Sequence, residues 1–393
     1  MPISSKISEN LTHSSWIRKM FETGIILKKQ YGSENVFDFS LGNPDLPSPP
    51  EFDDVLADEV KEKGCFVHGY MPNAGYPETR IAVADMLRRE SDLGFTKNNV
   101  IMTCGAAGAL NVILKSVLES GDEVIVIAPY FPEYDFYIDN HLGVKVESQS
   151  TEDFLPNLDD LDAKINSRTR AVLINSPNNP TGRIYPSETL TKLGELLLQK
   201  SENIGHPIYL LADEPYKKIV YDGLRYITPF RFYKNTILAT SFSKDLSLAG
   251  ERIGYLAVSP LIEDFGDIIN AAIFCNRILG YINAPALMQR VIRRVLDSRV
   301  DVSIYQRRRD ILYNVLKKIG YNVIKPEGTF YIFPKSPIAD DIEFVKALQE
   351  KRILVTPGSG FHRSGYFRIS FCVSEQTINR ALVGFEETFK EYR

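Results

Sequence analysis

The chain has 393 residues, more than a single hydrophobic core usually serves, so its length predicts two domains. Hydrophobic residues make up 44% of it and charged residues 24%, proportions that are typical of a globular protein in water. The formal net charge of -4 provides no basic field for nucleic acid and no polybasic patch for a membrane surface.

The cysteines and the N-terminal segment exclude further classes. The four cysteines, Cys65, Cys104, Cys275 and Cys372, lie far apart and form no C-x-x-C pair, which argues against a metal site or a disulfide framework. The N-terminal segment lacks the apolar core of a signal peptide. No apolar run approaches the roughly 18 residues of a membrane span. We therefore expect a cytoplasmic protein that binds no metal.

The first hundred residues predict helices separated by irregular loops. Helical periodicity covers residues 14–30, 51–63 and 78–90, and a short strand is expected at 36–39. The Gly/Pro-rich stretch 41–50 is a loop and a candidate domain boundary, and its Gly42 would let a ligand approach the backbone. A second loop at 69–77 holds Tyr70, which could donate to an anion but is more simply a packing residue.

A strand beginning at Ile101 changes into a Gly/Ala-rich turn that opens a helix to about Leu118. The backbone N–H groups of Ala106 and Ala107 would be a ready anion site at that helix N-terminus, although any tight turn favours small residues. The apolar run 122–131 predicts a buried strand. Phe131 lies just past the end of this strand, where its ring could cover a flat ligand, and a core phenylalanine is the simpler interpretation.

Three more buried strands, at 170–175, 208–212 and 236–240, are each followed by polar residues, and a fourth is expected at 255–258. The first leads into the rigid loop 176–182, which contains Asn179, and then a helix over 186–199. The second ends at Asp213, just before Pro215 and Tyr216. The third leads into a loop that carries Ser241, Ser243, Lys244 and Arg252.

Alternation of strands and helices between about 100 and 260 predicts a doubly wound, mainly parallel sheet. Its loops would meet at the carboxyl edge, so the polar groups named above would converge there. A lysine can act as a Schiff-base nucleophile when it is partly desolvated or near positive charge, and an arginine with serines suits a phosphate dianion. Lysine, phosphate cradle and a carboxylate are what pyridoxal phosphate requires.

The last part of the chain predicts a smaller α/β domain. Residues 260–320 are mostly helical, and we interpret their basic residues Arg293, Arg294, Arg307, Arg308 and Arg309 as a solvated helix face. Short strands at 328–333, 353–355 and 366–371 alternate with helices at 341–350 and 374–392. Arg368 stands inside an apolar strand, so it is either paired internally or reserved for an anionic ligand.

Taken together, these motifs resemble the class I/II aminotransferases, pyridoxal-phosphate enzymes of fold type I. Asn178-Asn-Pro-Thr-Gly182, Asp213-Glu-Pro-Tyr216 and Ser-Phe-Ser-Lys244 followed by Gly-Glu-Arg252-Ile-Gly stand in that family's order and spacing. The resemblance covers nearly the whole chain. It implies a large cofactor-binding domain over residues 46–290 and a small domain built from both termini, 1–45 plus 291–393.

The resemblance also implies roles for single residues. Lys244 would bond the cofactor aldehyde and shuttle a proton, Asp213 would face the pyridine nitrogen, and Asn179 and Tyr216 would bind the phenolic oxygen. Phe131 would stack on the ring, Arg368 would bind the substrate α-carboxylate, and Gly42 and Asn179 would also lie at the substrate. The phosphate would be held by Ala106, Ala107, Ser241, Ser243, Arg252 and, from the neighbouring subunit, Tyr70. A homodimer with shared active sites is therefore expected.

The expected reaction moves an amino group between an L-amino acid (aspartate, alanine, aromatic or a broad range) and a 2-oxo acid such as 2-oxoglutarate, by a ping-pong mechanism. Several aspartate-using relatives carry a lysine where this chain has Ala107, which puts aspartate in doubt. The same-fold alternative is a pyridoxal-phosphate lyase, either a β-C–S lyase or an enzyme like aminocyclopropane-carboxylate synthase. A transcription regulator is disfavoured because the N-terminal segment lacks basic character, and a nicotinamide dehydrogenase because no G-x-G-x-x-G motif follows the first strands.

Overall fold

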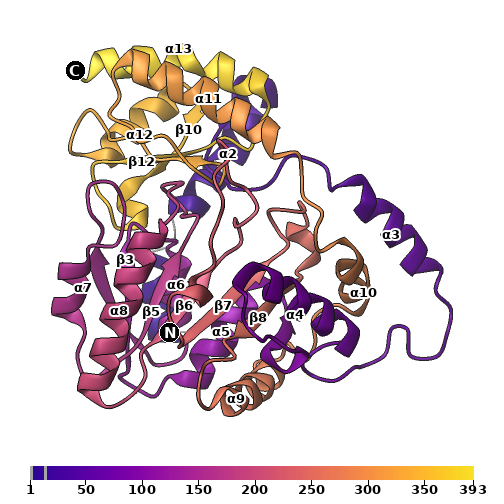
Figure 1. Ribbon diagram of the computed structural model, residues 1–393. Coiled ribbons are helices and arrows are strands. Elements are labelled where there is room, and N and C mark those ends of the chain that lie inside the picture. The colour runs from indigo at the N-terminus through magenta and orange to yellow at the C-terminus, as the bar shows by residue number, and fades with distance from the viewer. Residues whose placement is uncertain (1–2, 13–15) are drawn as a thin grey trace.

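The computed structural model describes residues 3–12 and 16–393, and a seven-stranded sheet lies at its centre (Figure 1). The helix predicted from residue 14 is observed over Trp16–Tyr31 (α2), while Ser14 and Ser15 lie outside the described residues. A short helix that the sequence did not predict, α1 (Ser5–Thr12), precedes it.

The large sheet has the strand order β2-β8-β7-β6-β5-β3-β4. Neighbouring strands from β7 to β4 pair in parallel, whereas β8 pairs antiparallel with both β2 and β7. Six strands therefore share one direction, which confirms the doubly wound, mainly parallel prediction; the reversed β8 was not predicted. The strands are β2 (Val100–Thr103), β3 (Glu123–Ala128), β4 (Val144–Gln149), β5 (Thr169–Asn175), β6 (Tyr209–Asp213), β7 (Thr236–Ser241) and β8 (Gly254–Val258).

Successive residues of each central strand pack on opposite faces, so both faces are covered. On β3, Val124 and Val126 belong to the cluster formed with helices α5 (Gly105–Val117) and α9 (Phe265–Ile278). Ile125 and Ile127 belong to the opposite cluster, formed with α8 (Ser187–Ile204) and α7 (Leu158–Lys164). A strand buried on both sides must be apolar at every position, which explains the continuous hydrophobic runs.

A third cluster covers the β2–β8 end of the sheet with helices α3 (Pro50–Lys61), α4 (Pro77–Ser91) and α10 (Ala286–Val295). A separate cluster contains most of the buried hydrophobic residues after position 300, together with Met20 and Phe39 from the N-terminal segment. Its elements lie above the large sheet in Figure 1 and are α11 (Val302–Ile319), β9 (Tyr331–Ile332), α12 (Asp341–Glu350), β10 (Ile353–Leu354), β11 (Thr356–Pro357), β12 (Phe367–Ser370) and α13 (Glu375–Glu391).

The two-domain division remains a proposal, which this distribution of clusters supports. Phe37 and Asp38 of β1 (Phe37–Asp38) pair with β10, so the N-terminal segment is built into the second unit. Val291 and Val295 of α10 pack with the large sheet. We therefore propose that the second boundary falls after α10, a few residues beyond position 291.

Several element predictions differ from the structure. The apolar run 122–131 is a strand only to Ala128, because Pro129 has no N–H with which to continue the ladder. The strand predicted at 328–333 is reduced to Tyr331–Ile332, because Thr329 has a left-handed backbone (φ 62°) and Gly328 bridges Val220 instead. The strand β4 and the helices α6 (Glu133–Asp139) and α7 were missed.

The interpretation of the basic residues near 300 as a solvated face is wrong for Arg308 and Arg309. The Arg309 side chain is fully buried and donates to Asp222 at 2.8 Å through both terminal nitrogens, and Arg308 donates to Asp45 at 2.7 Å. Each of these two arginines thus pairs with an acid from a distant part of the chain. A buried guanidinium is tolerated because carboxylates compensate its charge.

Within residues 3–12 and 16–393, no helix is both long and apolar enough to cross a bilayer. The same residues contain no group of three or more histidine, cysteine, aspartate or glutamate side chains that could hold a metal ion.

Candidate active site

A cavity of about 390 Å³ opens at the carboxyl edge of the large sheet, below the smaller unit. It is lined by twelve of the thirteen residues that the sequence singled out as site candidates: Gly42, Ala106, Ala107, Phe131, Asn179, Asp213, Tyr216, Ser241, Ser243, Lys244, Arg252 and Arg368. Strand β2 and strands β5 to β7 end at this edge and β8 begins there, so the topology brings these residues together.

Tyr70 is the exception. It lies between α3 and α4 in a loop, its side chain is 90% exposed, and it does not line the cavity of its own chain. The expectation that it acts from a neighbouring subunit stays a prediction.

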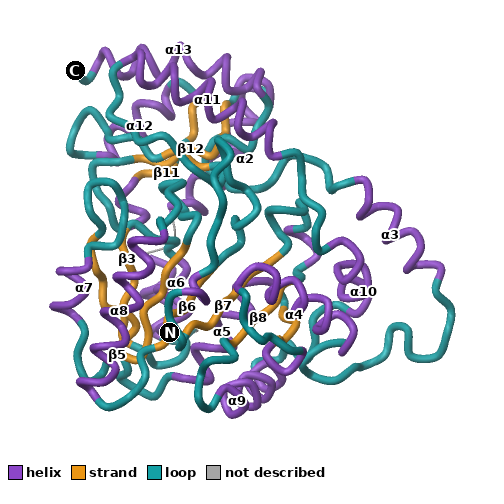
Figure 2. Tube along the Cα trace, in the orientation of Figure 1, coloured by secondary structure: helices purple, strands orange, loops and turns teal. Residues whose placement is uncertain are grey.

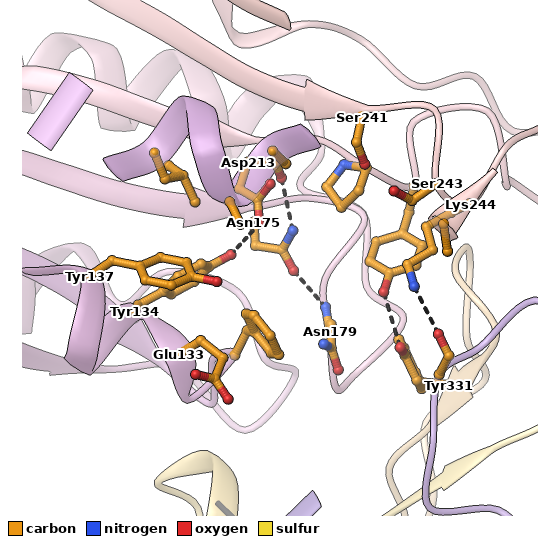
Figure 3. Close-up of a pocket in the computed structure, with 18 of the residues that line it drawn as sticks. Glu133, Tyr134, Tyr137, Asn175, Asn179, Asp213, Ser241, Ser243, Lys244 and Tyr331 are labelled. Carbon is orange, nitrogen blue, oxygen red and sulfur yellow. Dashed lines mark hydrogen bonds between the residues drawn. The ribbon is translucent and has the colours of Figure 1, made fainter. Parts of the chain in front are cut away.

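Lys244 enters the cavity just after β7, and its Nζ donates to the carbonyl of Gly42 at 2.8 Å (Figure 3). Burial, with the charges of Arg368 and Arg252, lowers the pKa of Lys244 to about 8, against the opposing effects of Cys372 and Asp213. A fraction of neutral amine is therefore present near neutral pH, as a lysine nucleophile requires.

Asp213, the last residue of β6, is buried at the floor of the cavity. Burial raises its pKa to about 7, while the hydroxyl of Tyr134 and the charge of Lys244 oppose the rise. Tyr134 donates to Oδ2 at 2.5 Å, whereas the buried Oδ1 has no hydrogen-bond partner in the described part of the chain. An unpartnered buried carboxylate oxygen is costly unless a donor from a ligand reaches it.

Asn175 fixes the loop that follows β5. Its side-chain nitrogen donates to the carbonyl of Asp213 at 2.8 Å, and its side-chain oxygen accepts from the backbone N–H of Asn179 at 2.7 Å (Figure 3). These two bonds hold Asn179 at a fixed place beside Asp213. The Asn179 side-chain oxygen in turn accepts from Arg368 at 3.0 Å.

Arg368 is almost fully buried on β12, and its described partners are neutral. Besides Asn179, it donates to the carbonyl of Ser40 at 2.6 Å, and its Nε has no partner among the described residues. Its guanidinium lies between the rings of Tyr331 and Phe361, 4.4 Å and 4.7 Å from their centroids. No described carboxylate pairs with Arg368, so of the two interpretations the geometry favours an anionic ligand.

The opposite end of the cavity combines a helix N-terminus with hydroxyls and a guanidinium. Ala106 and Ala107 stand in the first turn of α5, and Gly105 before them has a left-handed backbone (φ 74°). A Cβ at Gly105 would lie 2.7 Å from Arg252, so glycine leaves room for that side chain. The buried side chains of Ser241 and Ser243 make no hydrogen bond within the described chain. This end suits a phosphate.

Aromatic residues form the remaining wall. The hydroxyls of Tyr216 and Tyr331 lie 3.0 Å apart, and Phe131 packs edge-on against Tyr134 with 5.7 Å between centroids. A side chain at Gly42 would collide with the Tyr331 hydroxyl, so a glycine is required there.

The sequence did not identify five residues that take part in this geometry: Glu133, Tyr134, Tyr137, Asn175 and Tyr331. Asn175 ends a buried strand as Asp213 does, so the same argument about strand ends could have found it. The other four come from a missed helix, α6, and from a strand in the smaller unit. No spacing rule on the sequence pointed to them.

The residues present fit pyridoxal phosphate. The cavity offers an amine with a lowered pKa, an unpartnered carboxylate oxygen that could accept from a ring N–H, and unbonded hydroxyls at a helix N-terminus for a phosphate.

Residues 34–385 match the family model described as aminotransferase class I and II. The chain is 32% identical over 369 residues to a probable aspartate aminotransferase of Methanocaldococcus jannaschii, covering 91% of this chain and 94% of the relative. It is 33% identical over 363 residues to a probable aspartate/prephenate aminotransferase of Thermus aquaticus, with 89% and 91% covered.

Solved structures agree with these sequence matches. An amino transferase of Eubacterium rectale superposes over 100% of both chains with a TM-score of 0.96 and 39% identity. Aspartate aminotransferase of Thermus thermophilus with maleate covers 95% of this chain and 97% of its own, with a TM-score of 0.86 and 28% identity. The family model and all of these relatives are described as aminotransferases, and none of these matches favours the lyase alternative. The chain therefore belongs to the class I and II aminotransferases and is a pyridoxal-phosphate-dependent transaminase.

Proposed function

We propose that the enzyme moves an amino group between an L-amino acid and a 2-oxo acid such as 2-oxoglutarate, in two half-reactions that use the same cavity in turn. The single observation that carries this proposal is that Lys244 and Asp213 line one cavity together with Arg368, an arginine that no described carboxylate pairs. Amine, acid and anion site are the three groups that such an exchange needs from the protein.

Bound pyridoxal phosphate supplies an electron sink for the electrons released when the substrate α-carbon loses its proton. Lys244 takes that proton through Nζ and returns it, since its lowered pKa leaves a share of the amine neutral at working pH. Asp213 would hold a proton on the ring nitrogen through Oδ1, the oxygen that lacks a partner.

The remaining residues bind and orient. Arg368 and Asn179 would hold the substrate carboxylate, and Gly42 leaves the substrate side of the cavity open. Asn179 and Tyr216 would also donate to the phenolic oxygen, and Phe131 would cover the ring. The phosphate would be bound by Ala106, Ala107, Ser241, Ser243 and Arg252, all of which line one end of the cavity.

Location and assembly belong to this proposal as well. A cytoplasmic enzyme that acts on small molecules and binds neither nucleic acid nor membrane accords with the net charge of -4. We further propose a homodimer in which Tyr70 of one subunit completes the site of the other, because an exposed aromatic loop residue needs a partner surface.

Replacement of the lysine tests the proposal. Lys244→Ala should remove the visible absorbance band of the lysine-bound cofactor and lower turnover by ~10²–10⁴-fold, the usual effect of losing a general acid–base group. The matched control is Lys234→Ala, which removes an exposed lysine in the turn just before β7 and should leave both readouts unchanged. Turnover at the unmutated rate in the Lys244 variant would refute the assignment.

A further inference from the structure

Five charged side chains line the cavity, and the proposed function accounts for four of them. The basic ones among the described residues are Lys244, Arg252 and Arg368, and the acidic ones are Asp213 and Glu133. Lys244 is the reactive amine, Arg252 would bind the phosphate, and Arg368 would bind the α-carboxylate. Asp213 would face the ring nitrogen, which leaves Glu133 without a role. No described cation lining the cavity remains for a second substrate carboxylate.

Glu133 is the first residue of α6, where an acid also suits the helix dipole. That role alone would be satisfied by a side chain in solvent. The carboxylate instead lies half-buried in the wall of the cavity, on the same side as Tyr134 and Tyr137 and opposite Lys244 (Figure 3). It makes no hydrogen bond or ion pair with any residue in the described part of the chain.

The surroundings of Glu133 leave its charge uncompensated. Burial raises its pKa, and the neighbouring charge of Asp135 raises it further. Asp135 itself is engaged elsewhere, with Tyr130, Lys145 and His362. The pKa of Tyr137 is raised by burial and then by the charge of Glu133, so the acid acts on the interior of the cavity. A ligand that brings a cation or an N–H donor would relieve this state, and a ligand carboxylate would worsen it.

We propose that Glu133 sets the substrate preference: the cavity prefers amino acids whose side chain ends in an N–H donor, an amide or an ammonium, over those that end in a carboxylate. Because both half-reactions use the same cavity, it also binds a 2-oxo acid with a single carboxylate more tightly than 2-oxoglutarate. This inference rests on the proposed function, because it assumes that Arg368 holds the α-carboxylate and thereby leaves the distal group to Glu133. If so, the substrate specificity of this enzyme differs from that of the relatives named as aspartate aminotransferases.

The test compares two unreactive ligands of the same shape, maleate and its monoamide maleamate, which differ in one carboxylate. Their dissociation constants are measured by calorimetry on the cofactor-loaded enzyme. The native enzyme should bind maleamate at least about tenfold more tightly than maleate, since a charge-assisted hydrogen bond replaces a repulsion. Glu133→Gln should remove at least about tenfold of that preference, and Glu133→Ala should do the same if the glutamine variant folds poorly.

Glu195→Gln, the same chemical change at an exposed position of α8, should leave the preference unaltered. In the amino-donor half-reaction the native enzyme should favour glutamine over glutamate, and Glu133→Gln should narrow the ratio. Tighter binding of maleate by the native enzyme, or an unchanged ratio in both Glu133 variants, overturns the proposal. If the Lys244→Ala test succeeds while this one fails, the transamination assignment stands and only the substrate class is wrong.

Discussion

At the scale of single residues, the chemistry depends on how Asp213 is held. Its carboxyl is buried at a strand end, which by itself would keep it protonated and unable to attract a ring N–H. Tyr134 opposes that tendency by donating to Oδ2, and the charge of Lys244 does the same. The anion that the reaction needs is thus stabilised by a tyrosine from a neighbouring helix.

Removal of that hydroxyl should weaken cofactor binding. In Tyr134→Phe the pKa of Asp213 should rise above its present value of about 7, because a donor to the anion is lost. Cofactor affinity should fall ~10–100-fold, and the acidic limb of the pH–activity profile should move to higher pH. Equilibrium dialysis and the pH profile measure the two effects. Tyr185→Phe, a buried tyrosine outside the cavity, is the control; equal losses in both variants would contradict the argument.

The sequence predicted those residues of the site that lie at or just after the ends of strands. Asp213 ends a strand of the mainly parallel sheet, and Asn179 and Lys244 each come after one; the carboxyl ends of such strands share one edge. Tyr134 and Tyr331 could not be found that way, because Tyr134 lies in the first turn of a short helix and Tyr331 comes from the smaller unit. Their position depends on tertiary packing, which leaves no period in the sequence.

At the scale of elements, one short turn joins the two units beside the site. The 3-10 segment Gly358–Phe361 places Phe361 against Arg368, and His362 follows it. The His362 ring lies 3.0 Å from both Asp135 of α6 and Glu147 of β4 and stacks on Tyr130 with centroids 4.5 Å apart. A protonated imidazole therefore fastens the smaller unit to the large sheet.

This contact should make stability fall at alkaline pH. The two acids raise the pKa of His362 to about 9 against the effect of burial, above its ordinary value of 6.5. The stabilisation is fully present below pH 6.5 and is lost as pH rises through about 9. Denaturant unfolding at pH 6.5 and pH 9.5 should show a loss of roughly 1–2 kcal/mol that His362→Gln lacks. His206→Gln, whose ring meets backbone carbonyls, should keep the native dependence.

The elements that the sequence missed are those without a full apolar pattern. Strand β4 lies at the edge of the sheet and reads Val-Lys-Val-Glu-Ser-Gln, so polar residues interrupt its signal. Helices α6 and α7 have seven residues each, too few for a helical period to be distinct. The long buried strands and the helices over 341–350 and 374–392 were predicted well because burial imposes their pattern.

At the scale of the whole molecule, charged pairs and shared aromatic packing join segments that are distant in sequence. Tyr216 and Tyr221 come after strand β6 of the large sheet, yet the side chains of both pack in the hydrophobic cluster of the smaller unit. Arg309 of α11 reaches Asp222 beside them. Composition could not reveal these ion pairs, because an arginine on a helix is usually solvated. Only the fold shows that Arg308 and Arg309 are the buried ones.

The segment between α3 and α4 bears directly on assembly. It stands away from the rest of the chain at one side of the molecule (Figures 1 and 2). Phe66 and Tyr70 on it are 85% and 90% exposed. Exposure of two large aromatic side chains to water is unfavourable in an isolated chain. In the proposed dimer a second copy would cover them, and Tyr70 would lie at the active site of that copy.

A hybrid of two defective chains distinguishes a shared site from a separate one. Co-expression of a Lys244→Ala chain with a Tyr70→Phe chain, each carrying its own affinity tag, gives a dimer that is purified by both tags. If Tyr70 serves the neighbouring site, one site of the hybrid combines an intact Lys244 with an intact Tyr70. Cofactor titration should then show one site of native affinity, and an assay should show about half of native activity, although neither homodimer has such a site.

If Tyr70 acts within its own chain, the only site with Lys244 lacks the tyrosine hydroxyl and titrates like the Tyr70→Phe homodimer. A hybrid of native and Lys244→Ala chains should give half activity in both cases, so the contrast isolates the contribution of Tyr70 across the interface.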